Sequence, residues 1–247
     1  MMNTLLISGA TGRMGRQVAQ EARGQGFSLV AGLGRTADAG LPFPVYPQFA
    51  QVRERPEVVI DFSTPHLLED LLQYLRANGL PGVLCTSGYS AEQLRQIADA
   101  AQQVPLFQST NMSRGVYALR ALAALAVRML PGYDIEIIEK HHSKKADSPS
   151  GTALTLLSAV RQENSRVVYG REGELPPREA GEIGIHAVRG GTVTGEHEVG
   201  FYGNNEVILL SHQAQSRGVF AVGALAAARW LLGKGPGLYG MKDLMEG

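Results

Sequence analysis

The sequence predicts an α/β protein with two parts: a doubly wound parallel sheet, and an α+β region built on a mostly antiparallel open sheet. Two observations lead to this fold class. Short apolar runs alternate with amphipathic stretches through the first half of the 247-residue chain, which is the rhythm of β-α-β units. After Pro131, three strand-like runs instead follow one another across glycine-rich connections, which favours antiparallel pairing.

The first part is predicted from apolar runs typical of buried strands, most of them followed by a helical pattern. Capping residues mark two helix starts: Thr64 precedes Pro65, and Ser90 stands three residues before Gln93, which is capping-box spacing. A helix from Val219 to Leu232 is expected to pack back on this part. The predicted strands are Leu5–Ile7, Ser28–Leu33, Val58–Asp61, Gly82–Cys85 and Leu106–Phe107, and further helices are predicted over Arg13–Gly24 and Tyr117–Met129.

The second part is predicted to contain one strand, one helix and an antiparallel meander of three strands. Gly190-Gly191 and Gly203-Asn204-Asn205 supply hairpin chemistry between the meander strands. Because a meander commonly covers one face within a monomer, its other face is expected to be solvated or to meet another subunit. Arg171–Glu182 is expected to be a surface loop. The predicted elements are the strand Ile135–Glu139, the helix Thr152–Gln162, and the strands Ile183–Arg189, Thr192–Tyr202 and Glu206–Gln213.

Composition excludes several classes of function. The chain has 23 Lys+Arg and 23 Asp+Glu, and this zero net charge argues against a nucleic-acid or anionic-membrane binder. A single cysteine, Cys85, excludes an internal disulfide framework and a cysteine-rich metal site. The start has no signal-peptide layout, and the longest apolar stretch, Val219–Ala228, is too short to span a membrane. We therefore expect a cytoplasmic protein that binds neither nucleic acid nor membrane.

Three glycines follow the first predicted strand and open the first helix, in the pattern Gly9-x-x-Gly12-x-x-Gly15. Glycines let a backbone approach a pyrophosphate closely, and the helix N-terminus offers N–H groups and a favourable dipole. The spacing differs from the standard GxGxxG, so a purely structural turn stays an alternative. The position between strand and helix favours a Rossmann-like dinucleotide-binding domain.

The next diagnostic position is the end of the second strand, about 20 residues after the motif, where an acidic residue binds the ribose 2′-hydroxyl of NAD. Here the sequence reads Leu33-Gly34-Arg35-Thr36, with an arginine and no carboxylate. A guanidinium can pair with a 2′-phosphate that a carboxylate would repel. Arg35 therefore predicts a preference for NADPH, with NADH also possible. The alternative is that Arg35 is a solvated loop residue.

A cationic cluster occupies residues 140–145, where two histidines and three lysines lie within six residues. Such a patch attracts a small polyanion, and the helix start at Ser150-Gly151-Thr152 suits a carboxylate. His141 and Lys145 are candidate proton donors. A solvated loop, a weak nucleic-acid patch and an incidental metal-binding pair are the alternatives. A zinc site is disfavoured, since adjacent histidines cannot share one helix face and no third ligand is evident.

Together, these residues resemble a known family. The segment Ile135–Leu154 contains the pattern HHxxKxDxPSGTA, which is long and specific. It resembles the signature of the 4-hydroxy-tetrahydrodipicolinate reductases (dihydrodipicolinate reductases) of the diaminopimelate–lysine pathway. The resemblance runs nearly end to end and includes Gly9–Gly15, Asp61–Pro65, Thr86–Gly88, Thr110–Ser113, Gly195–His197 and Ser216-Arg217.

The resemblance implies an enzyme that uses NADPH or NADH to reduce a cyclic dihydrodipicolinate-type imine dicarboxylate. This substrate is formed from 4-hydroxy-tetrahydrodipicolinate, and the product is tetrahydrodipicolinate. The resemblance also implies a homotetramer. Residues 1–112 and 217–247 would form the dinucleotide-binding domain, residues 113–216 the substrate-binding and oligomerisation domain, and the cleft between them the place of reaction.

The resemblance further implies the roles of individual residues. His141 and Lys145 are the expected catalytic residues. The expected substrate-binding residues are His142, Lys145, Ser150, Gly151 and Thr152. The expected cofactor-binding residues are Gly9, Ala10, Thr11, Gly12, Arg13, Met14, Arg35, Cys85, Thr86, Ser87, Ser109, Thr110, Asn111 and Met112.

Four positions depart from the family's pattern. Gly34 replaces an acidic residue, which weakens the case for NAD. Cys85 replaces a glycine and is expected to be a buried small side chain, not a nucleophile. The other two are Lys140 and Arg114. Two alternative functions remain open: another two-domain NADP-dependent reductase or dehydrogenase of a small amino-acid-derived acid, and a nucleotide-sensing regulator without turnover.

Overall fold

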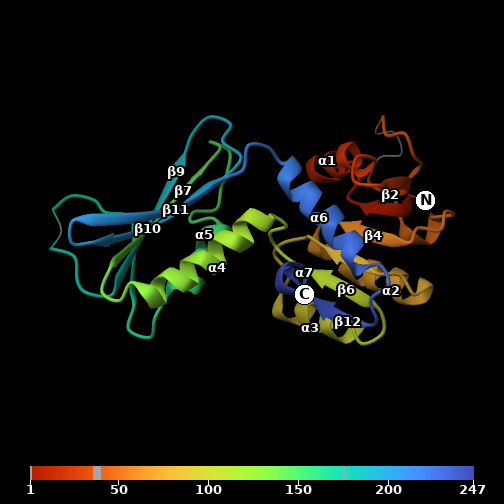
Figure 1. Cartoon of the computed structure of the whole chain (residues 1–247). Coiled ribbons are helices and arrows are strands. Elements are labelled where there is room, and N and C mark those ends of the chain that lie inside the picture. The colour runs from red at the N-terminus through yellow and green to blue at the C-terminus, as the bar shows by residue number, and fades with distance from the viewer. Residues whose placement is uncertain (1, 36–39, 175) are drawn as a thin grey trace. The chain divides into compact units, whose positions relative to one another are not determined.

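The computed structural model describes residues 2–35, 40–174 and 176–247. Thr36 of the predicted cofactor loop therefore lies outside the described residues, as does Leu175 of the predicted surface loop. The chain divides into two compact units (Figure 1). The first comprises Met1–Ser113 and Arg217–Gly247, and the second comprises Arg114–Ser216.

The first unit contains a seven-stranded sheet in which every pairing is parallel. The strand order is β12-β6-β5-β4-β1-β2-β3. The predicted parallel sheet is confirmed. Sequence patterns missed β3 and β12, which have two and three residues and are too short to form an apolar run. The strands are β1 (Asn3–Ser8), β2 (Phe27–Leu33), β3 (Val45–Tyr46), β4 (Val58–Asp61), β5 (Gly82–Leu84), β6 (Pro105–Gln108) and β12 (Gly237–Tyr239).

Helices cover both faces of this sheet. On one face, α2 and α3 pack against Leu6, Val59 and Leu106. Leu5 and Ile7 alternate with Leu6 and are also fully buried, so the opposite face is covered as well. There α1 and α6 contact each other and the sheet, as expected for the C-terminal helix. The helices are α1 (Arg13–Ala22), α2 (Leu68–Asn78), α3 (Ala91–Ala100), α6 (Gly218–Leu231) and α7 (Met241–Glu246), with 3₁₀ turns η1 (Phe49–Gln51) and η2 (Pro65–Leu67).

The two predicted helix starts differ in how they are capped. At α3 the capping box is confirmed: the N–H of Gln93 donates to Ser90 Oγ at 3.2 Å, and the N–H of Ser90 donates to Gln93 Oε1 at 3.0 Å. Thr64 holds the predicted N-cap position, but its side chain makes no capping bond. The turn it opens, η2, is a 3₁₀ turn that precedes α2.

The second unit contains a five-stranded mixed sheet in the order β11-β10-β7-β9-β8. β10 pairs antiparallel with β7 and β11, and β9 pairs parallel with β7 and β8. The fold class predicted for the whole chain is confirmed. The strands are β7 (Asp134–His141), β8 (Arg166–Tyr169), β9 (Glu182–Arg189), β10 (Glu196–Gly203) and β11 (Glu206–Gln213), and the helices are α4 (Arg114–Met129) and α5 (Gly151–Val160).

The predicted three-strand meander is wrong at its first turn. β9 and β10 are not neighbours, because β7 lies between them. Gly190-Gly191 bonds instead to the chain at the end of β7: the N–H of Gly190 donates to the carbonyl of His141 at 2.9 Å, and the N–H of Ser143 donates to that of Gly191 at 3.2 Å. Turn chemistry shows that a chain reverses, but not which strand becomes its neighbour. The second hairpin, between β10 and β11, is confirmed.

One face of this sheet packs on the two helices. Ile137, Ile185 and Phe201 are buried there against α4 and α5. Side chains alternate along each strand, so Glu136, Ile138 and Lys140 belong to the opposite face. No helix in the described part of the second unit packs on that face. Helices thus cover one face of this sheet, and the expectation that the other face meets solvent or another subunit stays a prediction.

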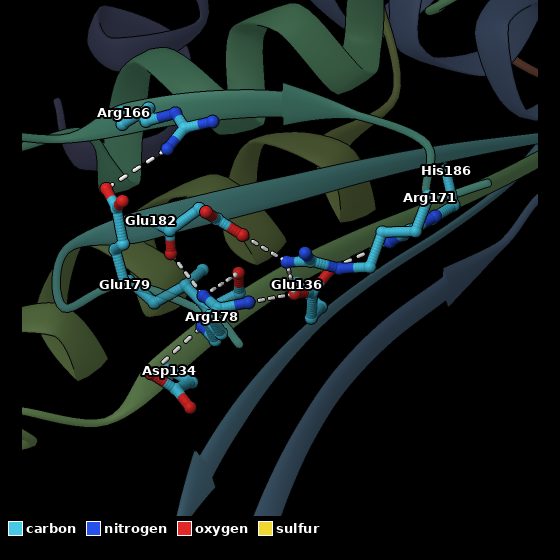
Figure 2. Close-up of polar contacts among 9 residues, drawn as sticks. Asp134, Glu136, Arg166, Arg171, Arg178, Glu179, Glu182 and His186 are labelled. Carbon is cyan, nitrogen blue, oxygen red and sulfur yellow. Dashed lines mark hydrogen bonds and ion pairs between the residues drawn. The ribbon is translucent and has the colours of Figure 1, made fainter. Parts of the chain in front are cut away.

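The predicted surface loop is anchored to the helix-free face by ion pairs, which Figure 2 shows. Glu136 accepts from Arg171 at 3.4 Å, from His186 Nε2 at 2.7 Å, and from Arg178. Gly184 is the register partner of Glu136, and a Cβ there would lie 1.9 Å from the carboxylate. Glycine therefore lets the carboxylate lie across β9. The loop therefore also links β7 to β9 through its arginines.

None of the described helices is both long enough and apolar enough to cross a membrane.

Candidate active site

The predicted cofactor residues lie at the carboxyl edge of the parallel sheet. β1 lies inside the sheet, with β2 on one side and β4 on the other. The chain runs from β1 to β2 and β3 and then crosses back to β4, so the β1–β4 boundary is a topological switch point. Ligands of open α/β sheets bind at such a point. The loops after β1, β4 and β5 all reach this edge.

The glycine loop after β1 has positions that only glycine fits. Gly9 has φ +78°, and a Cβ there would lie 2.6 Å from the carbonyl oxygen of Phe62. A Cβ at Gly15 would lie 2.2 Å from the carbonyl oxygen of Gly9. Gly12 is the N-cap of α1 and supplies no side chain to its N–H groups. The glycines thus let the loop pack closely on its own backbone and on the turn after β4. The N-terminus of α1 has no side-chain cap, which fits a bound pyrophosphate.

The other predicted residues of this loop differ in exposure. Ala10 is fully buried, and its N–H donates to the carbonyl of Leu33 at 2.7 Å. Gly12 and Arg13 are exposed, while Thr11 and Met14 are half-buried. Four of these five predicted residues are therefore at least partly exposed, and Ala10 is not.

A buried carboxylate at the end of β4, Asp61, was not among the predicted site residues. Asp61 Oδ2 accepts from Thr86 Oγ1 at 2.6 Å and from the hydroxyl of Tyr89 at 3.5 Å. Its other oxygen accepts from the N–H of Ser63 at 3.3 Å. Asp61 thus joins the ends of β4 and β5 beside the glycine loop. The sequence showed Asp61 at a strand end, but its hydrogen-bond partner Thr86 lies 25 residues further along the chain, so the pair forms no local motif.

Of the predicted turn residues Cys85, Thr86 and Ser87, only Ser87 is exposed. Burial, with the nearby charge of Asp61, raises the pKa of the Cys85 thiol well above its ordinary value. The interpretation of Cys85 as a buried small side chain is confirmed, and this thiol is not a nucleophile at neutral pH.

The predicted segment from Ser109 to Met112 follows β6. Ser109 Oγ donates to the carbonyl of Asn111 at 2.8 Å, and Asn111 Oδ1 accepts from the N–H of Ser113 at 2.9 Å. Thr110 is exposed and Met112 is buried. Local hydrogen bonds therefore hold this segment in a fixed turn.

Arg35 is the second residue after β2 and is exposed. Its neighbour Gly34 touches the glycine loop: a Cβ at Gly34 would lie 2.4 Å from Thr11 Cγ2. The end of β2 therefore lies against the start of the cofactor loop. In the described residues 33–35 no carboxylate is present.

In the second unit, a buried carboxylate organises the residues at the end of β7. Glu139 is fully buried, and Arg189 donates to both of its oxygens, at 2.7 and 2.8 Å. The N–H of Ser150 donates at 2.9 Å, and His141 Nδ1 lies at 2.6 Å. Burial opposes the charge, but the hydrogen bonds from Arg189, His141 and Ser150 keep the pKa of Glu139 below its ordinary value.

His141 is the last residue of β7 and is buried. Burial lowers its pKa, although the hydrogen bond and charge of Glu139 act to raise it. A Cβ at Gly195 would lie 3.0 Å from His141 Nε2. The absence of a side chain at that position leaves room beside this nitrogen.

His197 contacts both His141 and Ser150. Its ring meets that of His141 edge-on, with centroids 5.2 Å apart, and its Nε2 lies 3.2 Å from Ser150 Oγ. Ser150 in turn caps α5 by accepting from the N–H of Ala153 at 3.2 Å. Burial lowers the pKa of His197 to about 4. His197 is therefore neutral at pH 7.

The loop between β7 and α5 carries the remaining predicted residues. Lys145 Nζ pairs with Asp147 at 2.8 Å, and the hydrogen bond and charge of Lys145 lower the pKa of Asp147. Arg189 also donates to the carbonyl of Asp147 at 2.8 Å. His142 is half-buried, and its carbonyl accepts from the N–H of Lys145 at 3.1 Å.

The structure brings together three of the predicted residues, His141, Ser150 and, through its charge, Lys145. Gly151 starts α5 with no described atom within 4 Å of an added Cβ, beyond its chain neighbours and own helix, so the helix start is open on that side. Ser150 differs from expectation, because its N–H and hydroxyl both bond within the protein. Sequence reasoning missed Glu139, Arg189, His197 and Asp147 as members of this cluster.

The family is decided by two matches that together span almost the whole chain. Residues 3–112 match the model of the dihydrodipicolinate reductase N-terminus, and residues 115–245 match that of the C-terminus. The chain belongs to the dihydrodipicolinate reductase family. It is 46% identical over 250 residues to the 4-hydroxy-tetrahydrodipicolinate reductase of Caldanaerobacter subterraneus subsp. tengcongensis, covering 100% of this chain and 99% of that one. It is 44% identical to the enzyme of the same name from Clostridium novyi, over 99% of both chains.

Solved structures agree with this membership. A dipicolinate-bound dihydrodipicolinate reductase from Paenisporosarcina sp. TG-14 matches with a TM-score of 0.81 and 25% identity, over 99% of this chain and 100% of that one. A myo-inositol dehydrogenase from Corynebacterium glutamicum shares the fold alone, with a TM-score of 0.62 and 16% identity over 96% and 90% of the chains.

The family and the reductase activity predicted from the sequence are confirmed. The chain is an oxidoreductase of this family, which favours the predicted reductase over the nucleotide-sensing regulator and over another two-domain NADP-dependent reductase or dehydrogenase. The Rossmann-type unit supports NAD(P)H as the cofactor.

The buried neutral His197 predicts a pH-dependent stability. The folded protein binds that proton near pH 4 and an unfolded chain near pH 6.5, so stability falls as pH drops through this window. We expect the shifted pKa of His197 to lower the free energy of unfolding by about 2 kcal/mol between pH 7 and pH 5. The free energy of unfolding is measured in urea by circular dichroism at both pH values. From pH 7 to pH 5 it should fall by about 2 kcal/mol less in His197→Gln than in the unmodified chain.

The control is His66→Asn, which replaces an exposed histidine and should leave the decline of the unmodified chain unchanged. Equal declines in all three proteins would contradict the assignment of a neutral, buried His197.

Proposed function

We propose that this reductase acts on a cyclic dihydrodipicolinate-type imine dicarboxylate, formed from 4-hydroxy-tetrahydrodipicolinate, and releases tetrahydrodipicolinate in diaminopimelate and lysine biosynthesis. The similar enzyme from Paenisporosarcina was solved with dipicolinate, a planar dicarboxylate of this kind. The observation that carries the proposal is the cluster in the second unit, where a buried Glu139–His141 pair and Lys145 adjoin the N-terminus of α5. The cytoplasmic location stays a prediction.

The substrate carboxylates are assigned to the start of α5 and the lysine loop. Helix N-termini favour anions through their N–H groups and dipole. Gly151 and Thr152 are the first residues of α5, and His142 and Lys145 precede them in the same loop. Ser150 is buried and caps the helix, so its contribution is to hold this N-terminus in place.

The reaction needs a hydride and a proton. The nicotinamide supplies the hydride when bound. Hydride addition to the conjugated ring leaves an enamine-like anion on the substrate, and a nearby acid must protonate it. Lys145 and His141 are assigned this task, Lys145 as a cation and His141 through Nε2, the nitrogen beside Gly195. Asp147 holds Lys145 in place.

The cofactor is assigned to the carboxyl edge of the first unit, which serves as the dinucleotide-binding domain. The loop of Gly9, Gly12 and Gly15 opens α1, whose N-terminus has no side-chain cap and suits a pyrophosphate. Arg35 at the end of β2 is assigned to a 2′-phosphate, which makes NADPH the preferred cofactor. Further contacts are assigned to the remaining residues of the loop and of the turns after β5 and β6, namely Ala10, Thr11, Arg13, Met14, Cys85, Thr86, Ser87, Ser109, Thr110, Asn111 and Met112.

The second unit is also assigned to oligomerisation, through its helix-free sheet face. Val188, Val207 and Leu209 belong to this face by strand alternation and are 48, 51 and 53% exposed. Exposed apolar side chains on a sheet face without helices favour burial against another subunit. We therefore propose a homotetramer.

The proton-donor assignment predicts large losses of turnover. Lys145→Ala should lower kcat by about two to four orders of magnitude, the range for a lost general acid. His141→Ala should also impair turnover while leaving NADPH affinity nearly unchanged. The assay follows nicotinamide absorbance with freshly prepared substrate. Lys144→Ala, an exposed lysine of the same loop, is the control and should keep the original kcat. Undiminished turnover in both test variants would refute the assignment.

The cofactor assignment predicts that NADPH binds about ten to a hundred times more tightly than NADH. A charge-assisted contact to Arg35 is worth roughly 1.5–3 kcal/mol, and each 1.4 kcal/mol is about tenfold in affinity. Exposure of Arg35 moves the ratio toward the lower end. Arg35→Ala should erase most of the preference with little change in NADH affinity.

Both dissociation constants are measured at fixed ionic strength. Arg23→Ala removes an equal charge from an exposed position after α1 and should keep the preference. Equal affinities of the unmodified chain for the two cofactors would mean that Arg35 faces solvent.

The assembly assignment predicts a tetramer in light scattering at micromolar concentration. Leu209→Lys puts a charge on the helix-free face and should dissociate it. Leu122→Lys changes an equally exposed leucine of α4, 52% against 53%, and should leave the mass unchanged. A monomer for the unmodified chain would remove this claim.

A further inference from the structure

We propose that Glu139 is a positioning residue of the reaction: it fixes the Nδ1–H tautomer of His141 and joins that histidine to the N-terminus of α5. The reaction that these groups serve rests on the proposed function. The tautomer and the linkage follow from the geometry alone.

The tautomer follows from the partners of the carboxylate. Glu139 Oε2 lies 2.6 Å from His141 Nδ1 and also accepts from Arg189 at 2.8 Å. An ionised carboxylate only accepts hydrogen bonds, so the hydrogen of this contact belongs to Nδ1. Nε2 of neutral His141 then carries the lone pair. His141 therefore takes up and releases its proton at Nε2, where Gly195 leaves room.

The linkage follows from the second oxygen. Glu139 Oε1 accepts from the N–H of Ser150 at 2.9 Å and from Arg189 at 2.7 Å. Two oxygens thus hold four hydrogen bonds from β7, β9 and the start of α5. Rotation of the carboxylate would break several of these bonds at once, and a buried charge without partners is very costly. The orientation of His141 and the position of the helix start are therefore set together.

The charges around His141 predict opposite effects for two substitutions. Burial lowers the pKa of His141, Glu139 raises it, and Lys145 and Arg189 lower it. Loss of the Glu139 charge should therefore lower this pKa further, and loss of the Arg189 charge should raise it. The charged and titratable groups around His141 are Glu139 on β7, Arg189 on β9, His197 on β10 and Lys145 in the loop after β7.

The same strand offers a matched control. Glu136 lies three residues before Glu139 on the opposite face of β7, and it too accepts from two arginines and lies against a histidine (Figure 2). Glu136→Gln removes the same charge from a similar network. It leaves Glu139 and His141 untouched.

The experiment combines ¹⁵N NMR of histidine-labelled protein with the pH dependence of kcat for four proteins. In the unmodified chain and in Glu136→Gln, His141 should be protonated at Nδ1 at neutral pH. In Glu139→Gln, the carboxamide oxygen is drawn to Arg189, and the tautomer should move toward Nε2–H. The limb of the pH profile that reports His141 should fall by about one to three units in Glu139→Gln and rise in Arg189→Gln, with Glu136→Gln unshifted.

Three outcomes would overturn the proposal. One is an unchanged tautomer and limb in Glu139→Gln. Another is an equal shift in Glu136→Gln, which would mark a general packing effect. The third applies if Glu139→Gln fails to fold: an unchanged pKa of His141 in Arg189→Gln then overturns the proposal. Should the unmodified chain lack reductase activity, the proposed function fails, and the NMR titration of His141 still decides whether Glu139 sets its tautomer and pKa.

Discussion

The buried carboxylate of Glu139 is the constraint on which the rest of the second unit depends. A charge without water is tolerated only when its oxygens are fully hydrogen-bonded, and here the donors come from three separate elements. β7 and β9 must be in their parallel register for Arg189 to stand beside His141. The start of α5 must lie at the end of β7. The electrostatics of one residue therefore specify the relative placement of two strands and a helix.

On the helix-free face, the carboxylate of Glu136 is also neutralised by arginines, but these arginines belong to a loop. There the arginines come from a long loop, and half-exposed partners share the charge. Ion pairs thereby hold a loop that carries many polar residues against the sheet. The strand β7 thus has an acidic anchor on each face: one orders a candidate site, and the other orders a loop.

Sequence patterns predicted the first unit well because parallel strands buried on both faces form continuous apolar runs, as in Leu5–Ile7 and Val58–Ile60. Helix starts were found where side chains cap them, as at Ser90. The strands β3 and β12 were missed, since two or three residues form no pattern. The neighbours of β7 were also missed, because the order of strands depends on packing that turn residues do not encode.

The candidate site shows the same division. Motifs identified His141 and the helix start after Ser150, because these residues stand in one short segment. Their partners could not be found this way. Arg189 and His197 lie about 50 residues away and reach the site only through strand pairing. Glu139 carried a weak local signal, since an acid two residues before His141 shares its strand face. Sequence thus reveals the groups that meet a ligand more readily than those that hold them.

The contact between Gly34 and Thr11 restricts how this protein can evolve. An acidic side chain at Gly34 would need a Cβ within 2.4 Å of Thr11 Cγ2 and 2.8 Å of its hydroxyl. Such a change would therefore displace the glycine loop at Thr11 before any new contact with a ribose forms. A smaller residue at position 11 would remove these clashes. Nucleotide specificity through position 34 is thus coupled to the side chain at position 11, and the two positions are expected to change together.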